Sequence, residues 1–201
     1  MFVDRDAFDF VPRLESPWTA VRDEALALPD DLVEPWVEPH LYGTGWNLAG
    51  LQFLGREIAP TCVRCPKTAA MLRTIPGLAM ATFSRLAPGA HIATHTGWGD
   101  RVFRFHLALV VPGDCALRVG DEIRVWSEGI CFGFDDTVPH EAWNRSDRDR
   151  WVLMFDVIRP GLEGPAYDIA KLPTDLLKRL GNWFPDVDPA LGKPRKDVAS
   201  E

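Results

Sequence analysis

The stretch 101-RVFRFHLALVV-111 decides the fold class of this chain, because it reads as a β-strand with two different faces. Successive side chains of a strand point to opposite sides of the sheet. Arg104 and His106 therefore share one face, while Phe105 and Leu107 share the other. Such a strand is typical of the wall of a wet pocket, and it is equally typical of a solvent-exposed sheet.

Similar short segments, rich in β-branched, leucine and aromatic residues, lie on both sides of this stretch. They cover residues 80–86, 115–126, 129–134, 141–144 and 150–158. Turn-forming pairs separate them, and the Gly-Asp pair of 118-RVGDEI-123 predicts a tight hairpin. Several short strands at this spacing predict a mainly β fold, built as a sandwich or a barrel.

Two helices are expected ahead of the strands. In 16-SPWTAVRDEALALP-29, Ser16 is the expected N-cap, Pro17 the first helical residue and Pro29 the stop. The segment 65-CPKTAAMLRTIPG-77 again begins beside a proline and ends at Pro-Gly. We therefore expect flanking N-terminal helices.

The C-terminal part predicts one short helix and a tail. In 172-LPTDLLKRLGNWF-184, Thr174 is the expected cap and Gly181 the expected stop. The last ten residues, 192-GKPRKDVASE-201, are typical of a frayed or disordered end.

The whole sequence suits one domain, since 201 residues are enough for a sizeable core. We expect one domain with a C-terminal helix and tail. The boundaries are 1–165 for the domain, about 1–80 for its helical part, about 80–160 for its jelly-roll core, and 166–201 for the C-terminal helix and tail.

Composition excludes several classes of partner. The net charge of −7 argues against nucleic acid. No apolar run approaches the length that spans a bilayer, and the opening 1-MFVDRDAFDF-10 lacks the basic and apolar regions of a signal peptide. We therefore expect a cytoplasmic protein that binds neither nucleic acid nor membrane. Its oligomeric state is not predicted.

Two of the five histidines are candidate metal ligands. His95 lies in 92-IATHTGWGD-100, beside glycines that allow the backbone to pass close to a ligand. His140 follows 45 residues later, in 133-GFDDTVPHEAW-143. In a jelly roll, residues this far apart can meet at the mouth of the sandwich. The alternative is two unrelated loop histidines.

A third candidate is Arg150, which opens the apolar segment 150–158. A buried arginine needs an anionic partner, because an unpaired charge is costly in the interior. That partner is either an internal carboxylate or a ligand carboxylate held by two parallel hydrogen bonds.

Several motifs, taken in order, resemble the aspartyl/asparaginyl β-hydroxylase family of Fe(II)- and 2-oxoglutarate-dependent oxygenases. They are CPKT (65–68), FSRLAPGAHIATHTGWGDRVFRFHLAL (83–109), WSEGICFGFDDTVPHEAWN (126–144) and RWVLMFDVIRP (150–160), with YGTGWNLAGLQFLG (42–55) ahead of them. The similarity covers roughly 36–160. It implies a double-stranded β-helix, that is, a cupin-like jelly roll, and hydroxylation of an unactivated C–H with O2 and 2-oxoglutarate.

The resemblance implies that His95 and His140 are the iron ligands. Most oxygenases of this broad type add a carboxylate two residues after the first histidine, where this chain has Gly97. The β-hydroxylase family is similar in having glycine there, with water in the vacant position. Asp100 is the rival ligand, and the acidic pair 135–136 is expected to orient the site.

The resemblance also implies the co-substrate site. Arg150 is expected to bind the distal carboxylate of 2-oxoglutarate, with the hydroxyl of Ser84 beside it. Arg104 and His106 match an R-x-H motif of the family. We expect His106 near the co-substrate and Arg104 near a carboxylate of the substrate.

The substrate is the least defined part of this hypothesis. Relatives act on aspartyl or asparaginyl residues, on free amino acids or on acyl chains of lipids. Because the sequence shows no membrane anchor and no helical repeats, we expect an amino acid or peptide-type substrate. The alternative is a cupin-like metalloenzyme or metal-binding sensor module that does not use 2-oxoglutarate. Arg150 disfavours it, because such a protein needs no dicarboxylate anchor.

Overall fold

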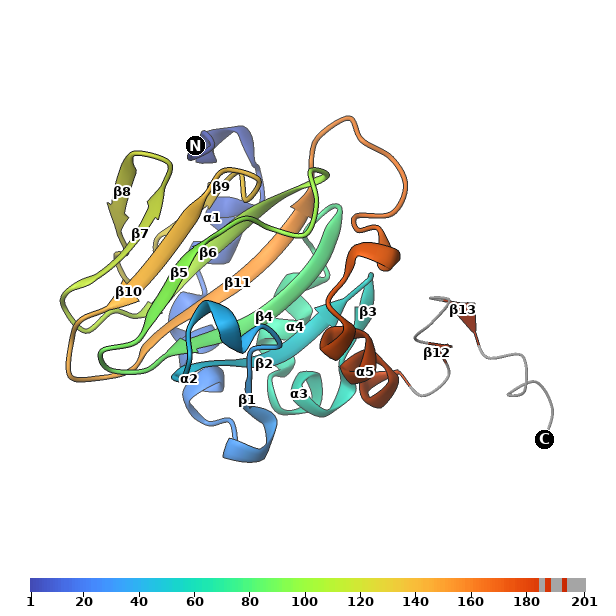
Figure 1. Cartoon of the computed structure of the whole chain (residues 1–201), viewed down its shortest axis with the longest axis horizontal. Coiled ribbons are helices and arrows are strands. Elements are labelled where there is room, and N and C mark those ends of the chain that lie inside the picture. The colour runs from blue at the N-terminus through green and yellow to red at the C-terminus, as the bar shows by residue number, and fades with distance from the viewer. Residues whose placement is uncertain (185–186, 189–192, 195–201) are drawn as a thin grey trace.

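The computed structural model describes residues 1–184, 187–188 and 193–194 (Figure 1). Two antiparallel sheets face each other across the core. The larger has seven strands in the order β1-β2-β4-β11-β6-β9, with β3 paired to β2, and the smaller has the order β5-β10-β7-β8. This arrangement is the expected mainly β jelly roll.

The larger sheet contains β1 (Glu34–Pro35), β2 (Trp46–Phe53), β3 (Arg56–Glu57), β4 (Leu78–Leu86), β6 (Val102–Val110), β9 (Cys131–Phe134) and β11 (Arg150–Ile158). The smaller contains β5 (His91–His95), β7 (Cys115–Val119), β8 (Glu122–Val125) and β10 (His140–Asn144). A separate pair joins β12 (Val187–Asp188) and β13 (Lys193–Pro194). The remainder of the predicted tail lies outside the described residues.

Every segment predicted to be a strand forms one, and the hairpin between β7 and β8 turns at Gly120, with φ +57. Apart from strands of only two residues, two strands were not predicted. β2 carries a glycine at its centre, and β5 is polar, with Ile92 as its one buried residue. Neither shows the regular alternation that identifies a strand from sequence.

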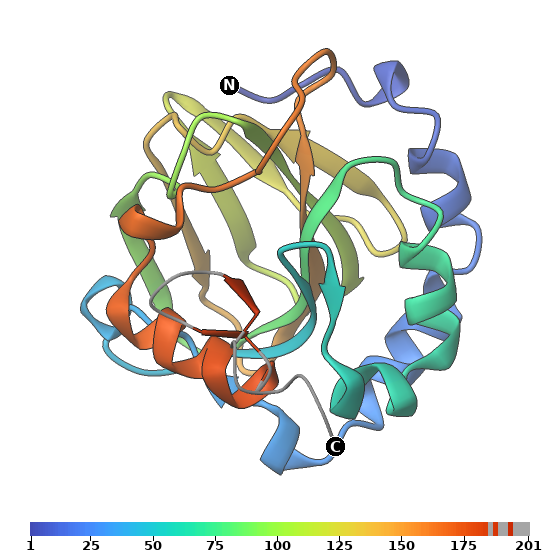
Figure 2. The same cartoon turned by 90° about the vertical axis from the view of Figure 1, so that its right-hand side faces the viewer.

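The described residues form five α-helices. Two of them precede β1, two lie between β3 and β4, and one follows β11. The helices are α1 (Val11–Glu15), α2 (Trp18–Leu26), α3 (Ala59–Arg64), α4 (Pro66–Leu72) and α5 (Thr174–Trp183), with 3-10 turns η1 (Arg5–Ala7), η2 (Asp30–Leu32), η3 (Pro39–Leu41) and η4 (Ile169–Lys171). Figure 2 shows α1 to α4 along one side of the two sheets and α5 on another.

The predicted helix caps are partly wrong. Ser16 terminates α1 instead of capping α2, whose N-cap is Pro17, and the helix stops at Leu26, ahead of Pro29. The reason is an extra short helix just upstream, which places Ser16 in helical backbone geometry.

The other two predicted helices also differ at their ends. α4 begins at Pro66 as predicted, but it ends at Leu72, ahead of the predicted stop at Pro76-Gly77. Its first N–H groups, at Lys67 and Thr68, donate to the side chain of Glu24 at 2.9 and 2.8 Å. In α5, Thr174 is the first helical residue, and Gly181 lies inside the helix.

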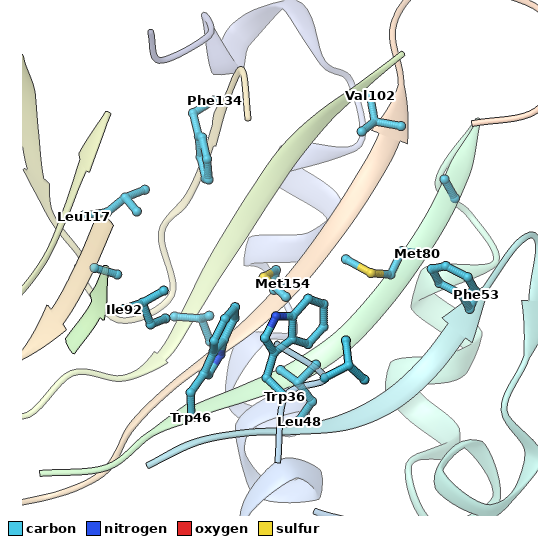
Figure 3. Close-up of a cluster of buried hydrophobic side chains, with 14 of the residues drawn as sticks. Trp36, Trp46, Leu48, Phe53, Met80, Ile92, Val102, Leu117, Phe134 and Met154 are labelled. Carbon is cyan, nitrogen blue, oxygen red and sulfur yellow. The ribbon is translucent and has the colours of Figure 1, made fainter. Parts of the chain in front are cut away.

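The larger sheet buries a different core on each face. Its outer face packs against α1 to α4 through residues such as Phe83, Phe105 and Phe155. Its inner face meets the smaller sheet through a cluster that includes Trp46 and Met154 (Figure 3). α5 adds its apolar residues to this inner cluster. The predicted boundary at residue 165 stays a prediction.

Within the described residues, no helix combines the length and the apolar character that crossing a bilayer requires.

Candidate active site

His95 and His140 lie side by side, although 45 residues separate them in the sequence. They are register partners on the neighbouring strands β5 and β10. Their ring centroids are 4.2 Å apart, and the rings are tilted by 55°. The interpretation as unrelated loop histidines is therefore wrong, because the jelly-roll topology brings the two rings together.

Hydrogen bonds to the backbone select the tautomer of both rings. His95 Nδ1 lies 2.8 Å from the carbonyl oxygen of Ala93, and His140 Nδ1 lies 2.9 Å from that of Val138. A carbonyl only accepts hydrogen bonds, so Nδ1 carries the proton in both rings and Nε2 keeps its lone pair. This is the tautomer of a histidine that binds metal through Nε2.

Both rings are neutral near pH 7. Burial, followed by the neighbouring His95, lowers the pKa of His140 to about 3. Burial also lowers the pKa of His95, despite the opposing hydrogen bond to Ala93. Neutral imidazole is the form that coordinates a metal ion, so the site holds its candidate ligands ready for one.

Gly97 is required by a close approach of Asp136. A Cβ built on Gly97 would overlap Asp136 Oδ2, closer than any side chain can be. Asp136 is buried, and burial raises its pKa to about 7 despite the nearby guanidinium of Arg104. A carboxylate from the segment before β10 therefore occupies the space that a side chain at position 97 would fill.

The described residues contain no group of three or more His, Cys, Asp or Glu side chains placed to hold one metal ion. The rival ligand Asp100 therefore does not complete a three-residue set with the two histidines.

A cavity between the sheets brings together all six candidate residues. The space left between its side chains for a water-sized molecule is about 20 Å³. Its polar lining consists of Ser84, His95, Arg104, His106, His140 and Arg150. Apolar side chains complete the wall, among them Trp46, Phe134 and Met154. Residues from β4, β5, β6, β10 and β11 thus converge on one space.

Arg150 enters this cavity, and among the residues that the structure describes it has no acidic partner. Its side chain is 1% exposed, and its one hydrogen bond is a long contact of 3.4 Å from Nη1 to the carbonyl oxygen of Ser84. Arg150 Nε has no partner. Burial lowers the pKa of Arg150 to about 10, so the group still carries its charge at pH 7.

His106 is also unsatisfied, since neither of its ring nitrogens has a hydrogen-bond partner. Burial, and then the charge of Arg150, keep its pKa well below the usual range, so the ring is neutral. Ser84 Oγ accepts a hydrogen bond from Trp46 Nε1 at 3.0 Å. Buried polar atoms are rarely left unpaired, and this concentration at one cavity indicates a missing polar ligand.

Arg104, by contrast, is already paired. Its Nε and Nη2 donate to both oxygens of Asp156 at 2.8 and 2.7 Å, and Nη2 lies 3.4 Å from Asp136 Oδ2. Tyr167 donates a further hydrogen bond to Asp156, of 2.6 Å. These carboxylates raise the pKa of Arg104 against the opposing effect of burial. The predicted contact between Arg104 and a substrate carboxylate stays a prediction.

Sequence reasoning missed Asp156, Tyr167 and Trp126 at this site. Asp156 carried a usable signal, because alternation along β11 puts it on the same face as Arg150. It is also the register partner of Arg104 on β6. Tyr167 and Trp126 lie outside the strands, and no local pattern relates them to the cavity.

The protein is thus a jelly roll with a cavity that contains two neutral histidines and a buried arginine. Among the described residues, no acidic side chain pairs with this arginine. The chain belongs to the aspartyl/asparaginyl β-hydroxylase family, since the sequence profile described as Aspartyl/Asparaginyl beta-hydroxylase matches residues 15–160.

Two curated relatives are hydroxylases by name. The chain is 40% identical to the ornithine lipid ester-linked acyl 2-hydroxylase of Rhizobium tropici over 61% of this chain and 44% of that protein. It is 32% identical to the human aspartyl/asparaginyl beta-hydroxylase over 77% of this chain and 22% of that protein. The chain thus spans less than half the length of either relative.

Two solved structures are similar in outline. One is an oxidoreductase of the 2OG-Fe(II) oxygenase family from Burkholderia pseudomallei, with a TM-score of 0.49 and 12% identity over 75% of this chain and 88% of that one. The other is the Cupin_2 domain of an XRE family transcriptional regulator from Enterobacter cloacae, with a TM-score of 0.41 and 16% identity over 58% of this chain and 99% of that one.

Proposed function

We propose that this chain is an Fe(II)- and 2-oxoglutarate-dependent dioxygenase that hydroxylates an unactivated C–H of an amino acid or peptide-type substrate. One observation carries the proposal. Two neutral histidines with free Nε2 atoms line the same cavity as a buried arginine that has no carboxylate partner.

The donor set fits a ferrous ion. His95 and His140 would hold it through Nε2, and two protein ligands leave positions free for small molecules. Iron bound there supplies the redox chemistry by which O2 and 2-oxoglutarate turn C–H into C–OH, with succinate and CO2 as co-products. The hydrogen bonds to Ala93 and Val138 orient both rings before any ligand binds.

The unsatisfied groups of the cavity fit the dicarboxylate. Arg150 presents a charged fork that binds a carboxylate through two parallel hydrogen bonds. The neutral ring of His106 offers one donor and one acceptor, and Ser84 offers its hydroxyl proton. Apolar side chains around these groups exclude water, which strengthens each of the contacts.

Arg104 retains one route to the substrate. Its hydrogen bonds to Asp156 use Nε and Nη2, so Nη1 is the nitrogen left to contact a substrate carboxylate. In this proposal Asp136 and Asp156 hold the guanidinium in place, and the substrate adds a third anionic partner. We infer that the carboxylate of an amino acid or peptide fits this end of the cavity.

An acyl chain is the second candidate substrate, and a specific observation favours it. A second, small pocket of about 20 Å³ is lined by Trp36, Phe53, Met80, Trp98 and Trp183 among others, and Figure 3 shows the first three of these in the inner cluster. It is largely apolar, and apolar cavities suit hydrocarbon chains. The Rhizobium tropici relative is an acyl hydroxylase by name.

The test is succinate formation by the iron-loaded protein with O2, 2-oxoglutarate and a panel of amino acids, peptides and acylated amino acids. We expect one class to stimulate turnover and His140→Ala to abolish it. The matched control is His91→Ala, which removes an exposed histidine of the same sheet that pairs with Glu141. Turnover that does not require 2-oxoglutarate would instead support the cupin-like alternative.

A further inference from the structure

The indole of Trp126 lies against two of the unsatisfied groups of the cavity. The guanidinium carbon of Arg150 is 4.8 Å from its ring centroid. The ring of His106 lies nearly parallel to it, at 24° and 5.9 Å between centroids. Trp126 directly follows β8, so it reaches both groups from outside the strands that carry them.

Trp126 is held by packing alone. Its side chain is buried in the inner core, and its Nε1 has no hydrogen-bond partner. A buried tryptophan usually places its N–H on an acceptor. Here the face of the indole ring, and not its N–H, contacts Arg150 and His106.

A buried arginine such as Arg150 normally has an acidic side chain beside it that neutralises its charge. Among the described residues, no carboxylate lies within ion-pair distance of this guanidinium, and none raises its pKa. The π face of an indole attracts a cation electrostatically, so Trp126 stabilises the charge that no carboxylate neutralises.

The π face of an aromatic ring and a carboxylate differ in how many N–H donors of an arginine they leave free for a ligand. A carboxylate would take two N–H donors of the guanidinium and compete with an incoming anion. An aromatic ring stacks on the flat face of arginine and leaves the N–H donors at its edge. The donors of Arg150 are free in this structure apart from the long contact to the carbonyl of Ser84.

We propose that Trp126 is a positioning residue for the co-substrate, which fixes the plane of Arg150 so that its donor edge faces the cavity. This inference rests on the proposed function. Trp126 takes the place of a neutralising acid, stabilising the charge while leaving it available to a carboxylate ligand. The near-parallel ring of His106 lies against the same indole, so one side chain supports both co-substrate groups.

The experiment is calorimetric titration of 2-oxoglutarate into the Fe(II)-loaded protein without O2, so that binding is measured without turnover. The variants are Trp126→Leu, which removes the π face, and Trp126→Phe, which keeps a weaker one. Trp151→Leu is the matched control. It removes a buried indole of β11 that contacts Arg85, on the opposite face of the sheet.

We expect Trp126→Leu to weaken 2-oxoglutarate binding about 30-fold and Trp126→Phe about 5-fold, with Trp151→Leu within 2-fold of the parent protein. In turnover, KM for 2-oxoglutarate should rise with little change in kcat. Thermal unfolding identifies any variant that fails to fold, and Trp126→Phe then decides the question.

Three results would overturn the inference. Trp126→Phe and Trp126→Leu that bind as the parent does would show that the indole is not needed. An equal loss in Trp151→Leu would show a general packing effect. If the parent protein itself binds no 2-oxoglutarate, the proposed function fails and this inference fails with it.

Discussion

Two buried arginines on the inner face of the larger sheet have opposite surroundings. Arg104 forms a two-pronged ion pair with Asp156 and lies near Asp136. Arg150 has an indole, that of Trp126, and no acid. The first charge is neutralised by the protein itself. The second is stabilised but not neutralised, which is the state that a binding site for an anion requires.

The two surroundings also differ in energy. A buried ion pair with good geometry roughly repays the cost of removing its charges from water, whereas an unpaired buried charge does not. The pKa values follow this difference, since carboxylates raise that of Arg104 and burial lowers that of Arg150 to about 10. We infer that the Arg104 end of the cavity contributes most to stability and the Arg150 end to binding of the co-substrate.

The largest expected effect tests the Arg104 end. Arg104→Met leaves Asp136 and Asp156 buried without their cation, so we expect the free energy of unfolding to fall by about 3–5 kcal/mol. Urea denaturation followed by circular dichroism measures it. Arg124→Met, which removes an exposed ion pair with Glu122, is the control and should cost less than about 1 kcal/mol. A similar loss in Arg104→Met and Arg124→Met would show that the buried ion pair at the Arg104 end stabilises the fold no more than an exposed one.

The next effect tests the Arg150 end. Arg150→Met replaces a lone buried cation by an apolar side chain, so the ligand-free protein should lose less than about 1 kcal/mol of unfolding free energy or become more stable. Binding of 2-oxoglutarate should weaken about 100-fold, equivalent to about 3 kcal/mol, because the charged fork is lost. Calorimetry and urea denaturation on the same samples provide both numbers. Unchanged affinity would exclude Arg150 as the anchor.

A third effect concerns the neutral histidines that line the same cavity. At pH 7, His140 is neutral in both the folded and the unfolded chain. Below the unfolded pKa of about 6.5, the unfolded chain binds a proton that the folded chain refuses until about pH 3. The unfolded state therefore binds more protons in this window, and the free energy of unfolding falls as the pH falls.

His140→Asn isolates this contribution. Between pH 7 and pH 5, the metal-free parent protein should lose about 2 kcal/mol more unfolding free energy than the variant, from ~1.4 kcal/mol per pH unit over about 1.5 units. The raised pKa of Asp136 acts in the opposite direction in both proteins and cancels in the comparison. Urea titrations at the two pH values measure the difference. Parallel curves would mean that His140 is protonated inside the fold.

The contrast between the two ends was only half visible in the sequence. Alternation along β6 correctly placed Arg104 and His106 on one face of a strand, but it left open whether that face lined a pocket or met solvent. Arg150 was identified only as the first residue of an apolar strand, and the structure brings all three to the same cavity. Alternation could not assign their partners, because pairing depends on register between strands. Asp156 lies 52 residues after Arg104, yet the two are opposite each other on neighbouring strands.

Other features escaped the sequence for related reasons. β5 was missed because Ile92 is its one buried residue, so its sequence shows no alternation of apolar and polar residues. The cap of α4 comes from Glu24, more than forty residues upstream. Local patterns thus predicted most of the longer elements, and the family resemblance supplied the roles of the candidate residues. The contacts that distinguish a paired arginine from a free one are long-range.

The smallest expected effect concerns Tyr167, which lies beyond residue 160, where the match to the family profile ends. It tests whether this residue contributes to the stability of the Arg104 end. Tyr167 donates a hydrogen bond to Asp156 and stacks on Phe53, with 5.6 Å between ring centroids. Tyr167→Phe keeps the stacked ring and removes one hydrogen bond to a charged group, so unfolding free energy should fall by about 1.5 kcal/mol.

The control for this variant is Tyr42→Phe, which removes a hydrogen bond to the neutral carbonyl oxygen of Trp36 and should cost about 0.5–1 kcal/mol. Affinity for 2-oxoglutarate should stay within about twofold of the parent in both, because Arg150 makes no contact with Asp156 or Tyr167 in the described structure. A tenfold loss in Tyr167→Phe would show that the two ends are coupled. Arg104 would then also contribute to the 2-oxoglutarate site, and the ion pair with Asp156 would position it for that ligand.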